Sequence, residues 1–252
     1  YHRDRDANLA YLARALNSVE FDLLALPELF TCGYAFDDPA ELAAFSEDLT
    51  ASPTVAALRE LAAASGGALT GTIPERAGGQ LFNTAILVDS TGLVGIQRKK
   101  HLPDYEKRSF TPGQGIATFA IGGAKVGMMS CFDCWFPAFG AFLKQEGAQI
   151  FVNSASFGGP VTPAILPVRA RENQVFVVSC NRIGTEYFAG EPDTFCGQSQ
   201  IISPDGRILT SAGTDETLAV VEIDLAEVDH PAFGSLICHN FPEEHRKYRI
   251  TV

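Results

Sequence analysis

The sequence lacks several features that would place the protein outside the cytoplasm. No apolar run reaches the roughly 20 residues that a helix needs to cross a bilayer, and no charged-then-apolar leader precedes the first helical pattern. Asn-x-Ser/Thr sequons are absent, and the six cysteines are too scattered for the disulfide framework of a small secreted domain. We therefore expect a cytoplasmic protein with reduced thiols. Since Tyr1 is not an initiator, we also expect that the natural chain begins earlier and that its first strand is missing here.

Positive charge is also scarce. The 252 residues include 19 Lys and Arg against 30 Asp and Glu, which gives a formal net charge of −11 at pH 7. This balance opposes binding to phosphate backbones and to anionic membrane surfaces, so we expect no nucleic-acid partner and no membrane partner. With 46% hydrophobic and 19% charged residues, the chain can bury a large core. No repeat, low-complexity tract or linker divides it, and we predict a single domain over residues 1–252.

The apolar pattern indicates a mixed α/β fold. Helical spacing predicts helices over residues 6–19, 53–64, 137–146 and 163–173. Short apolar runs predict strands over residues 21–26, 68–73, 82–88, 93–97, 116–121, 125–130, 149–152, 175–179, 198–202, 207–210 and 218–223. Alternation of strand and helix implies parallel pairs, while turn signals at residues 89–92 and 204–206 imply antiparallel hairpins. We expect the polar tail, residues 230–252, to wrap a surface or a partner subunit.

Three residues occupy positions where open α/β sheets place functional groups. Cys131 ends an apolar strand before a turn and a helix, where backbone N–H groups favour a thiolate nucleophile, although an isolated cysteine is more often a packed core thiol. Glu28 follows a very apolar strand, as a general base or as a surface carboxylate at a loop start. Lys99 belongs to a long polar loop, residues 98–115, where lysines usually form a hydrated face.

Other kinds of site compete for the same cysteine. Cys131 and Cys134 have the Cys-x-x-Cys spacing of thiol–disulfide oxidoreductases and of half a zinc site, but a closed zinc site needs two further ligands at matching spacing. We therefore expect no metal and no cofactor. A Cys/His hydrolase would need a partner histidine, and none of the candidates has a recognisable context: His101, His230, His239 and His245.

Considered together, the candidates fall into three ordered blocks. The blocks are Leu26-Pro27-Glu28-Leu29-Phe30 with Gly33-Tyr34, Arg98-Lys99 with His101-Leu102-Pro103, and Ser130-Cys131-Phe132-Asp133 with Phe136-Pro137. Their order and spacing resemble the nitrilase superfamily of carbon–nitrogen hydrolases. Further matches follow in order at residues 82–85, 110–113, 169–174, 181–184 and 197–199, so the resemblance covers nearly the whole chain.

The resemblance implies a fold and a set of catalytic residues. The fold is a four-layer α-β-β-α sandwich with mixed sheets, which forms a homodimer or a higher homo-oligomer through its sheet-covering helices. Glu28 corresponds to the general base, Lys99 to the lysine that holds the oxyanion, and Cys131 to the nucleophile. Glu106 corresponds to a second glutamate that orients the lysine and the substrate. We add the backbone N–H of Phe132 as a second oxyanion donor.

The substrate that the resemblance favours is a small linear amide, hydrolysed with water to an acid and ammonia. Phe132-Asp133 follows Cys131, where true nitrilases usually have Trp and then Glu, so amides are preferred to nitriles. N-carbamoyl amino acids, nitriles and a catalytically silent binding homologue stay open. The aromatic side chains expected to line the substrate pocket are Tyr34, Trp135, Phe157 and Phe188. Three arginines remain possible ligands for a substrate carboxylate: Arg169, Arg171 and Arg182.

Overall fold

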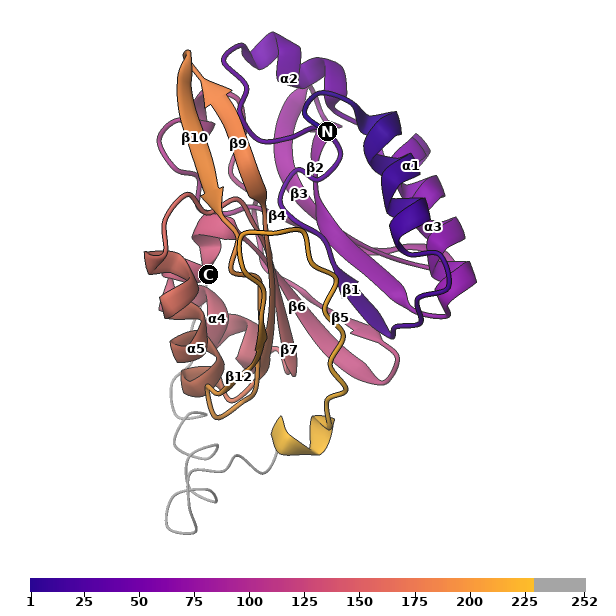
Figure 1. Ribbon diagram of the computed structural model, residues 1–252, viewed down its shortest axis with the longest axis vertical. Coiled ribbons are helices and arrows are strands. Elements are labelled where there is room, and N and C mark those ends of the chain that lie inside the picture. Colours follow the sequence, from indigo (N-terminus) through magenta and orange to yellow (C-terminus); the bar gives the residue numbers. More distant parts are fainter. Residues whose placement is uncertain (229–252) are drawn as a thin grey trace.

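Two β-sheets packed face to face form the centre of the computed structural model, which describes residues 1–228 (Figure 1). The first sheet has the strand order β1-β2-β3-β4. Its strands are β1 (Leu23–Ala25), β2 (Ala68–Ala77), β3 (Gln80–Asp89) and β4 (Gly92–Arg98). β1 is parallel to β2, whereas β2, β3 and β4 form an antiparallel meander. The catalytic candidates Glu28 and Lys99 therefore follow strands of this one sheet.

The second sheet has the strand order β12-β11-β8-β7-β6-β5. Its strands are β5 (Thr118–Ile121), β6 (Ala124–Ser130), β7 (Ile150–Ala155), β8 (Phe176–Asn181), β11 (Gln200–Ile202) and β12 (Ile208–Ser211). β6, β7 and β8 run parallel, and antiparallel strands flank them on both sides. A separate hairpin of β9 (Ile183–Phe188) and β10 (Glu191–Cys196) projects from one end of the molecule (Figure 1).

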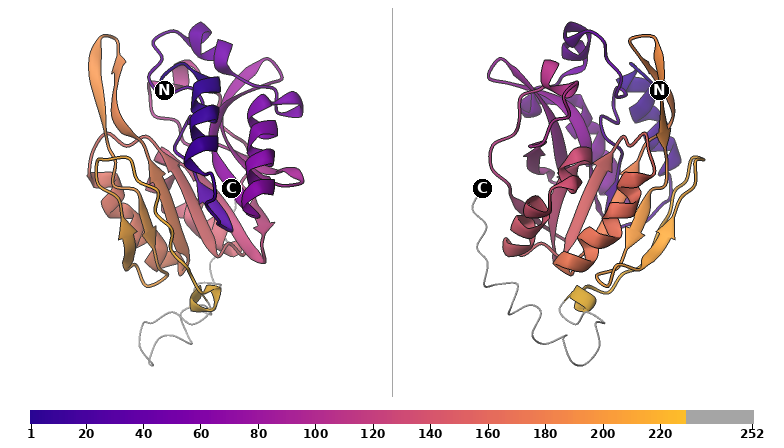
Figure 2. Two further views of the ribbon diagram at one scale, coloured as in Figure 1. Left: turned by 45° about the vertical axis from the view of Figure 1, so that its right-hand side comes forward. Right: turned by 90° about the vertical axis from the view of Figure 1, so that its left-hand side faces the viewer.

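Helices cover the outer faces of both sheets, as the two side views make clear (Figure 2). α1 (Arg5–Ala15) and α3 (Pro53–Ser65) lie on the first sheet, and α4 (Pro137–Gln145) and α5 (Val161–Asn173) lie on the second. The short helix α2 (Pro39–Phe45) lies near one end of the molecule. Four 3₁₀ helices complete the elements: η1 (Leu49–Ala51), η2 (Glu106–Arg108), η3 (Cys131–Trp135) and η4 (Leu225–Val228).

The alternation of side chains along each strand explains the layers. Leu87 of β3 and Met128 of β6 point between the sheets and share one core. Ile86, next to Leu87, points outward and packs with Leu58 of α3. Met129, next to Met128, packs against α4 on the far side of the second sheet. Both sheets are thus apolar on two faces, and the expected four-layer α-β-β-α sandwich with mixed sheets is confirmed.

Most of the expected elements are present, with shifted ends. The helix expected to reach residue 19 ends at Ala15, and the backbone of Ser18 has a φ of 66°, which a right-handed helix does not allow. The strand expected over residues 218–223 is wrong: the segment pairs with no strand among residues 1–228, and Leu218 and Val220 are exposed. α2 and the β9–β10 hairpin were not expected from the sequence. The tail from residue 230 lies outside the described residues.

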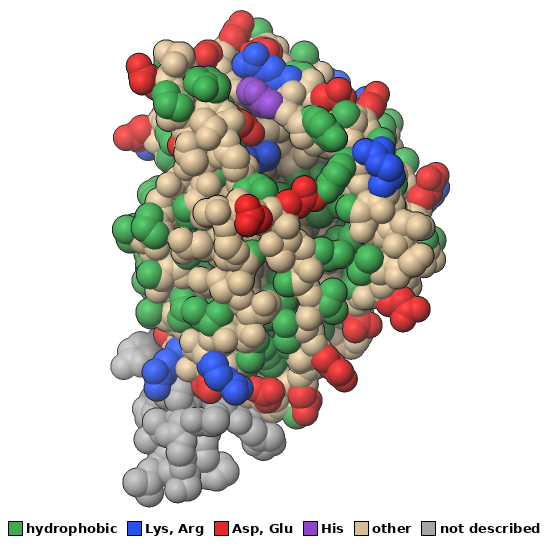
Figure 3. Space-filling model, in the orientation of Figure 1, with side chains coloured by type: hydrophobic (Ala, Val, Ile, Leu, Met, Phe, Trp, Pro, Cys, Tyr) green, Lys and Arg blue, Asp and Glu red, His purple; other side chains and the backbone are tan. Residues whose placement is uncertain are grey.

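Acidic side chains are spread along the edge of the molecule beside α1 and α3 on the face shown in Figure 3. Within residues 1–228, the structure has no helix with the length and apolar character to span a membrane.

Candidate active site

Glu28 lies at the end of β1 in a strained and fully enclosed position. Its side chain is 0% exposed, and the next residue, Leu29, has a φ of 47°. Strained backbone of this kind persists where the surroundings hold it in place. Here Arg182 supplies that hold, because its Nη2 donates to the carbonyl oxygen of Glu28 at 2.5 Å and to that of Leu29 at 3.1 Å. Arg182 therefore fixes the backbone of Glu28 and, through it, the position of the carboxylate.

Lys99 follows β4 and bridges two carboxylates. Its Nζ donates to Oε1 of Glu28 at 2.7 Å and to Oε1 of Glu106 at 2.5 Å, and the residue is 1% exposed. Asn83 of β3 donates from Nδ2 to the same oxygen of Glu28 at 2.7 Å. Burial opposes the charge of Lys99, but the carboxylates of Glu106 and Glu28 outweigh it and hold the pKa of the ammonium well above its usual value. This raised pKa keeps the ammonium group of Lys99 charged at neutral pH.

Glu106 comes from η2 in the polar loop and completes the charged cluster. Its Oε1 also accepts a hydrogen bond from the Tyr34 hydroxyl at 2.6 Å. Burial raises the pKa of Glu106 to about 7, although Lys99 opposes the rise. The second carboxylate oxygen, Oε2, of both Glu28 and Glu106 is buried and has no hydrogen-bond partner within residues 1–228. Each carboxylate thus keeps one oxygen available for a further donor.

Cys131 starts η3 directly after β6 and is held on a sharp turn. Its φ is 48°, an uncommon value outside glycine, and the residue is 7% exposed. Burial and the negative charge of Glu28 raise the pKa of the thiol well above its usual value, although Lys99 acts in the opposite direction. Burial and Glu28 therefore act against the thiolate that the helix start is expected to favour, and the role of Cys131 as nucleophile stays a prediction. Phe132 follows in η3, where the first N–H groups have no carbonyl acceptor inside the helix.

Asp133 joins the lysine loop to the cysteine turn. Its Oδ1 accepts hydrogen bonds from the backbone N–H of His101 at 2.9 Å and of Lys100 at 3.3 Å, and it lies 2.8 Å from Nδ1 of His101. Its Oδ2 accepts from the backbone N–H of Ser130 at 3.2 Å. The residue is 0% exposed. One buried carboxylate thereby sets the spacing between the segments that carry Lys99 and Cys131.

His101 and Cys134, which a Cys/His hydrolase or a redox pair would use as partners of Cys131, make other contacts. His101 is bound to Asp133 and its ring stacks on Phe136 at 3.7 Å between centroids. Cys134 is 0% exposed, and burial raises the pKa of its thiol to about 12. The three remaining candidate histidines, His230, His239 and His245, lie outside the described residues.

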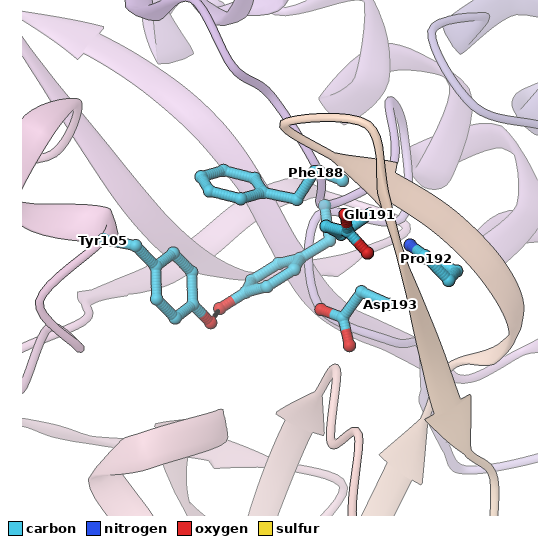
Figure 4. A pocket seen from close by; sticks show the side chains of 7 residues that line it. Tyr105, Phe188, Glu191, Pro192 and Asp193 are labelled. Atoms are coloured by element: carbon cyan, nitrogen blue, oxygen red, sulfur yellow. Dashed lines mark hydrogen bonds between the residues drawn. The ribbon is translucent and has the colours of Figure 1, made fainter.

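A pocket of about 250 Å³ adjoins the charged cluster of Glu28, Lys99 and Glu106. Its lining is Tyr34, Ala35, Tyr105, Phe188, Glu191, Pro192 and Asp193. Figure 4 shows Phe188, Glu191 and Asp193 coming from the β9–β10 hairpin, with Tyr105 on the opposite side. Tyr34 connects the pocket to the cluster because its hydroxyl contacts both Tyr105 and Glu106.

The four expected pocket residues separate into two pairs. Tyr34 and Phe188 line this pocket. Phe157 instead lies in the core between the second sheet and its helices. Trp135 is 39% exposed and donates from Nε1 to Thr162 at 3.2 Å.

Two of the arginines considered for a substrate carboxylate have structural partners. Arg182 holds the backbone of Glu28 and pairs with Glu186 at 3.4 Å. Arg169 donates from Nε to the carbonyl oxygen of Cys134 at 2.7 Å, at the end of the cysteine turn. Sequence reasoning missed the roles of Asn83 and Asp133, although both stand inside matched blocks. The available signal was that each is a polar residue inside a matched block.

Comparisons with known proteins match nearly the whole chain. Residues 3–231 match the sequence profile of a family described as carbon-nitrogen hydrolase. A protein named nitrilase from Pyrococcus abyssi (strain GE5 / Orsay) is 36% identical over 216 residues, which cover 85% of this chain and 81% of the relative. An (R)-stereoselective amidase of Pseudomonas sp is 33% identical over 234 residues, covering 89% of this chain and 83% of the relative. The crystal structure of a carbon-nitrogen hydrolase from Helicobacter pylori G27 superposes with a TM-score of 0.86 at 25% identity, covering 99% of this chain and 92% of that one.

Proposed function

This chain belongs to the carbon–nitrogen hydrolase family, and from that premise we propose that it hydrolyses a linear amide to a carboxylic acid and ammonia through Glu28, Lys99 and Cys131. The observation that carries the proposal is the bridge from a fully buried Lys99 ammonium to Glu28 and Glu106, beside a cysteine on a strained turn. Burying three charged groups costs desolvation free energy even when they are paired, so stability alone does not explain this arrangement and it supports a functional role.

The first step joins proton transfer to nucleophilic attack. Because burial and the charge of Glu28 raise the pKa of the Cys131 thiol, the thiol needs a base at the moment of attack, and we assign that role to Glu28. A bond forms between Sγ and the amide carbon while the thiol proton passes to Glu28. The carbonyl oxygen becomes negative, and Lys99 and the N–H of Phe132 stabilise it.

The second step releases ammonia and then the acid. Glu28 returns the proton to the amide nitrogen, the carbon–nitrogen bond breaks, and a thioester remains on Cys131. A water molecule then gives a proton to Glu28 and bonds to the acyl carbon. The carbon–sulfur bond breaks, the sulfur takes the proton back, and the acid leaves. Glu106 orients Lys99 through the 2.5 Å contact and stays clear of the reacting atoms.

Ammonia release tests the proposal. The panel contains aliphatic amides, ω-amides, N-carbamoyl amino acids and nitriles, since relatives are named both amidase and nitrilase. We expect amides to be the best substrates, and Cys131→Ala to lower kcat by roughly 10³-fold or more. Cys134→Ala is the matched control, because it removes a buried thiol three residues along the same turn and should keep activity. Equal loss in both variants, or a panel with no substrate for the folded protein, would overturn the proposal.

We also propose how the chain is organised. Residues 1–252 form one carbon–nitrogen hydrolase domain, a proposal supported by the family profile, which covers residues 3–231. The cytoplasm suits a catalytic thiol that must stay reduced, and five cysteines within residues 1–228 are free thiols. A homodimer forms through the helices that cover the second sheet, where Val161 and Val168 are exposed two turns apart on α5.

A further inference from the structure

The pocket beside Glu106 combines aromatic walls with acidic groups. Tyr105 stands 5.8 Å from the ring of Tyr34 and 6.0 Å from the ring of Phe188, so three aromatic rings surround one space. Glu191 and Asp193 enter the same space from β10 (Figure 4). Aromatic faces attract a cation through their quadrupoles, and carboxylates attract it through charge.

The acidic groups of the pocket have no counter-ion within residues 1–228. Neither the carboxylate of Glu191 nor that of Asp193 makes a hydrogen bond or an ion pair in this part of the chain. Asp193 pairs in register with Glu186 on β9, which places two carboxylates on one face of the hairpin. Burial and the charge of Glu186 raise the pKa of Asp193. Like charges opposite each other destabilise a hairpin, and a positively charged ligand would relieve that repulsion.

Lys99 and Arg182 are paired with carboxylates outside the pocket. Arg108, in contrast, contacts two residues of the lining from outside it. Its Cζ lies 5.2 Å from the ring centroid of Phe188, and its Nε donates to the carbonyl oxygen of Tyr105. The lining therefore carries negative charge only.

We propose that this pocket binds the ammonium end of the substrate, so that the enzyme selects linear amides with a primary amine at the far end of the chain. The inference rests on the proposed function, and it adds Asp193, Glu191 and the ring of Phe188 as specificity-determining groups. Tyr34, which lines the pocket, donates to Oε1 of Glu106 at 2.6 Å, and the same oxygen accepts from Nζ of Lys99 at 2.5 Å, so the pocket adjoins the catalytic cluster. A substrate with a few methylene groups can thus place its amide at Cys131 and its ammonium at the hairpin.

Matched pairs of amides isolate the charge. β-Alaninamide, γ-aminobutyramide and δ-aminovaleramide are compared with butanamide, pentanamide and hexanamide, in which a methyl group replaces the ammonium. Adipamate supplies the opposite charge at the length of δ-aminovaleramide. We expect kcat/KM to favour the ammonium member of at least one pair by about tenfold or more, with adipamate the poorest substrate. Equal values within every pair would overturn the inference while leaving the hydrolase proposal intact.

Variants assign the preference to the hairpin. Asp193→Asn and Glu191→Gln should together bring the ammonium-to-methyl ratio close to one, whereas Asp193→Glu should keep most of it. Glu60→Gln is the matched control, because this exposed carboxylate on α3 lies on the far side of the first sheet and the ratio should not change. An unchanged ratio in the double variant would show that the ammonium binds elsewhere.

A binding measurement separates this inference from the catalytic one. Calorimetric titration of the wild-type protein with pentylammonium should give binding that pentanol does not reproduce and that Asp193→Asn weakens. Such binding in a protein that hydrolyses no amide would support the pocket and overturn the proposed reaction. Absence of pentylammonium binding, together with equal turnover of the paired amides, would remove the pocket assignment alone.

Discussion

Glu106 is a buried carboxylate whose pKa lies near neutral pH. Burial raises its pKa to about 7, so the carboxylate is charged above that pH and becomes neutral as the pH falls through it. The neutral form balances Lys99 less well and no longer accepts hydrogen bonds equally from Lys99 and Tyr34. We therefore expect kcat/KM to fall below about pH 7, approaching tenfold per pH unit. Glu106→Gln should lower activity and remove this acidic limb.

A neighbouring carboxylate provides the control for this pH profile. Asp104 lies in the same loop, with a fully exposed side chain paired to Lys107, whose hydrogen bond lowers the pKa of Asp104. Asp104→Asn should keep both the activity and the acidic limb. If Glu106→Gln retained the limb, the titration would belong to another group, with Glu28 the first to test.

The residues of the site differ in how far sequence alone could place them. Glu28, Lys99 and Cys131 stand in ordered blocks, so their selection needed only the linear pattern. Their protonation needed the fold, because the raised pKa of Cys131 comes from burial and from a carboxylate more than a hundred residues away. Arg182 shows the same limit. Its bond to the carbonyl of Glu28 joins two strand ends that only the packing of the two sheets brings together.

At the scale of elements, η3 and the loop after β4 act as one unit through Asp133. The carboxylate accepts hydrogen bonds from Ser130 on one side and from Lys100 and His101 on the other. Asp133→Asn replaces one acceptor oxygen by an NH2 donor. A backbone N–H group that bound this oxygen then faces another donor. Because misplacement by about 1 Å can lower a rate by about 10²-fold, we expect kcat to fall by that order while KM changes little.

An equally destabilising variant elsewhere tests whether Asp133 acts by position. Asp133→Asn should lower the free energy of unfolding by about 2–4 kcal/mol. Leu58→Ala, in the fully buried contact between α3 and the first sheet, should lower it by about 2–5 kcal/mol and leave kcat unchanged. Thermal melts measure the loss of stability in each variant, and kinetics measured well below Tm show whether kcat falls as well. A comparable loss of kcat in Leu58→Ala would reduce Asp133 to a general structural role.

Sequence reasoning missed the β9–β10 hairpin as well as α2, and with the hairpin it missed the acidic part of the pocket. Its turn has Ala189 and Gly190 at φ values of 52° and 82°, a conformation that Asn-Gly would signal and that Ala-Gly does not. Apart from residues 218–223, the strands with a continuous apolar run were placed within a few residues. β9 and β10 have mixed polarity because one face lines a pocket, so the apolar pattern was too weak to mark them.

At the scale of the whole molecule, α5 presents an apolar face that residues 1–228 leave exposed. Val161 and Val168 are 62% and 54% exposed, and Trp135 lies beside the start of α5 through its bond to Thr162. With a formal charge of −11, two copies repel each other, so apolar burial has to drive their association.

A charge placed at the centre of this face tests the proposed homodimer. Val168→Asp should convert a wild-type dimer to a monomer, because an unpaired carboxylate would be buried at the contact. Val220→Asp is the matched control: Val220 is 65% exposed but lies outside α5, and its replacement should leave the dimer intact. Light scattering after gel filtration measures both masses. A wild-type protein that stays monomeric at micromolar concentration, or dissociation in both variants, would contradict the assignment of α5 as the interface.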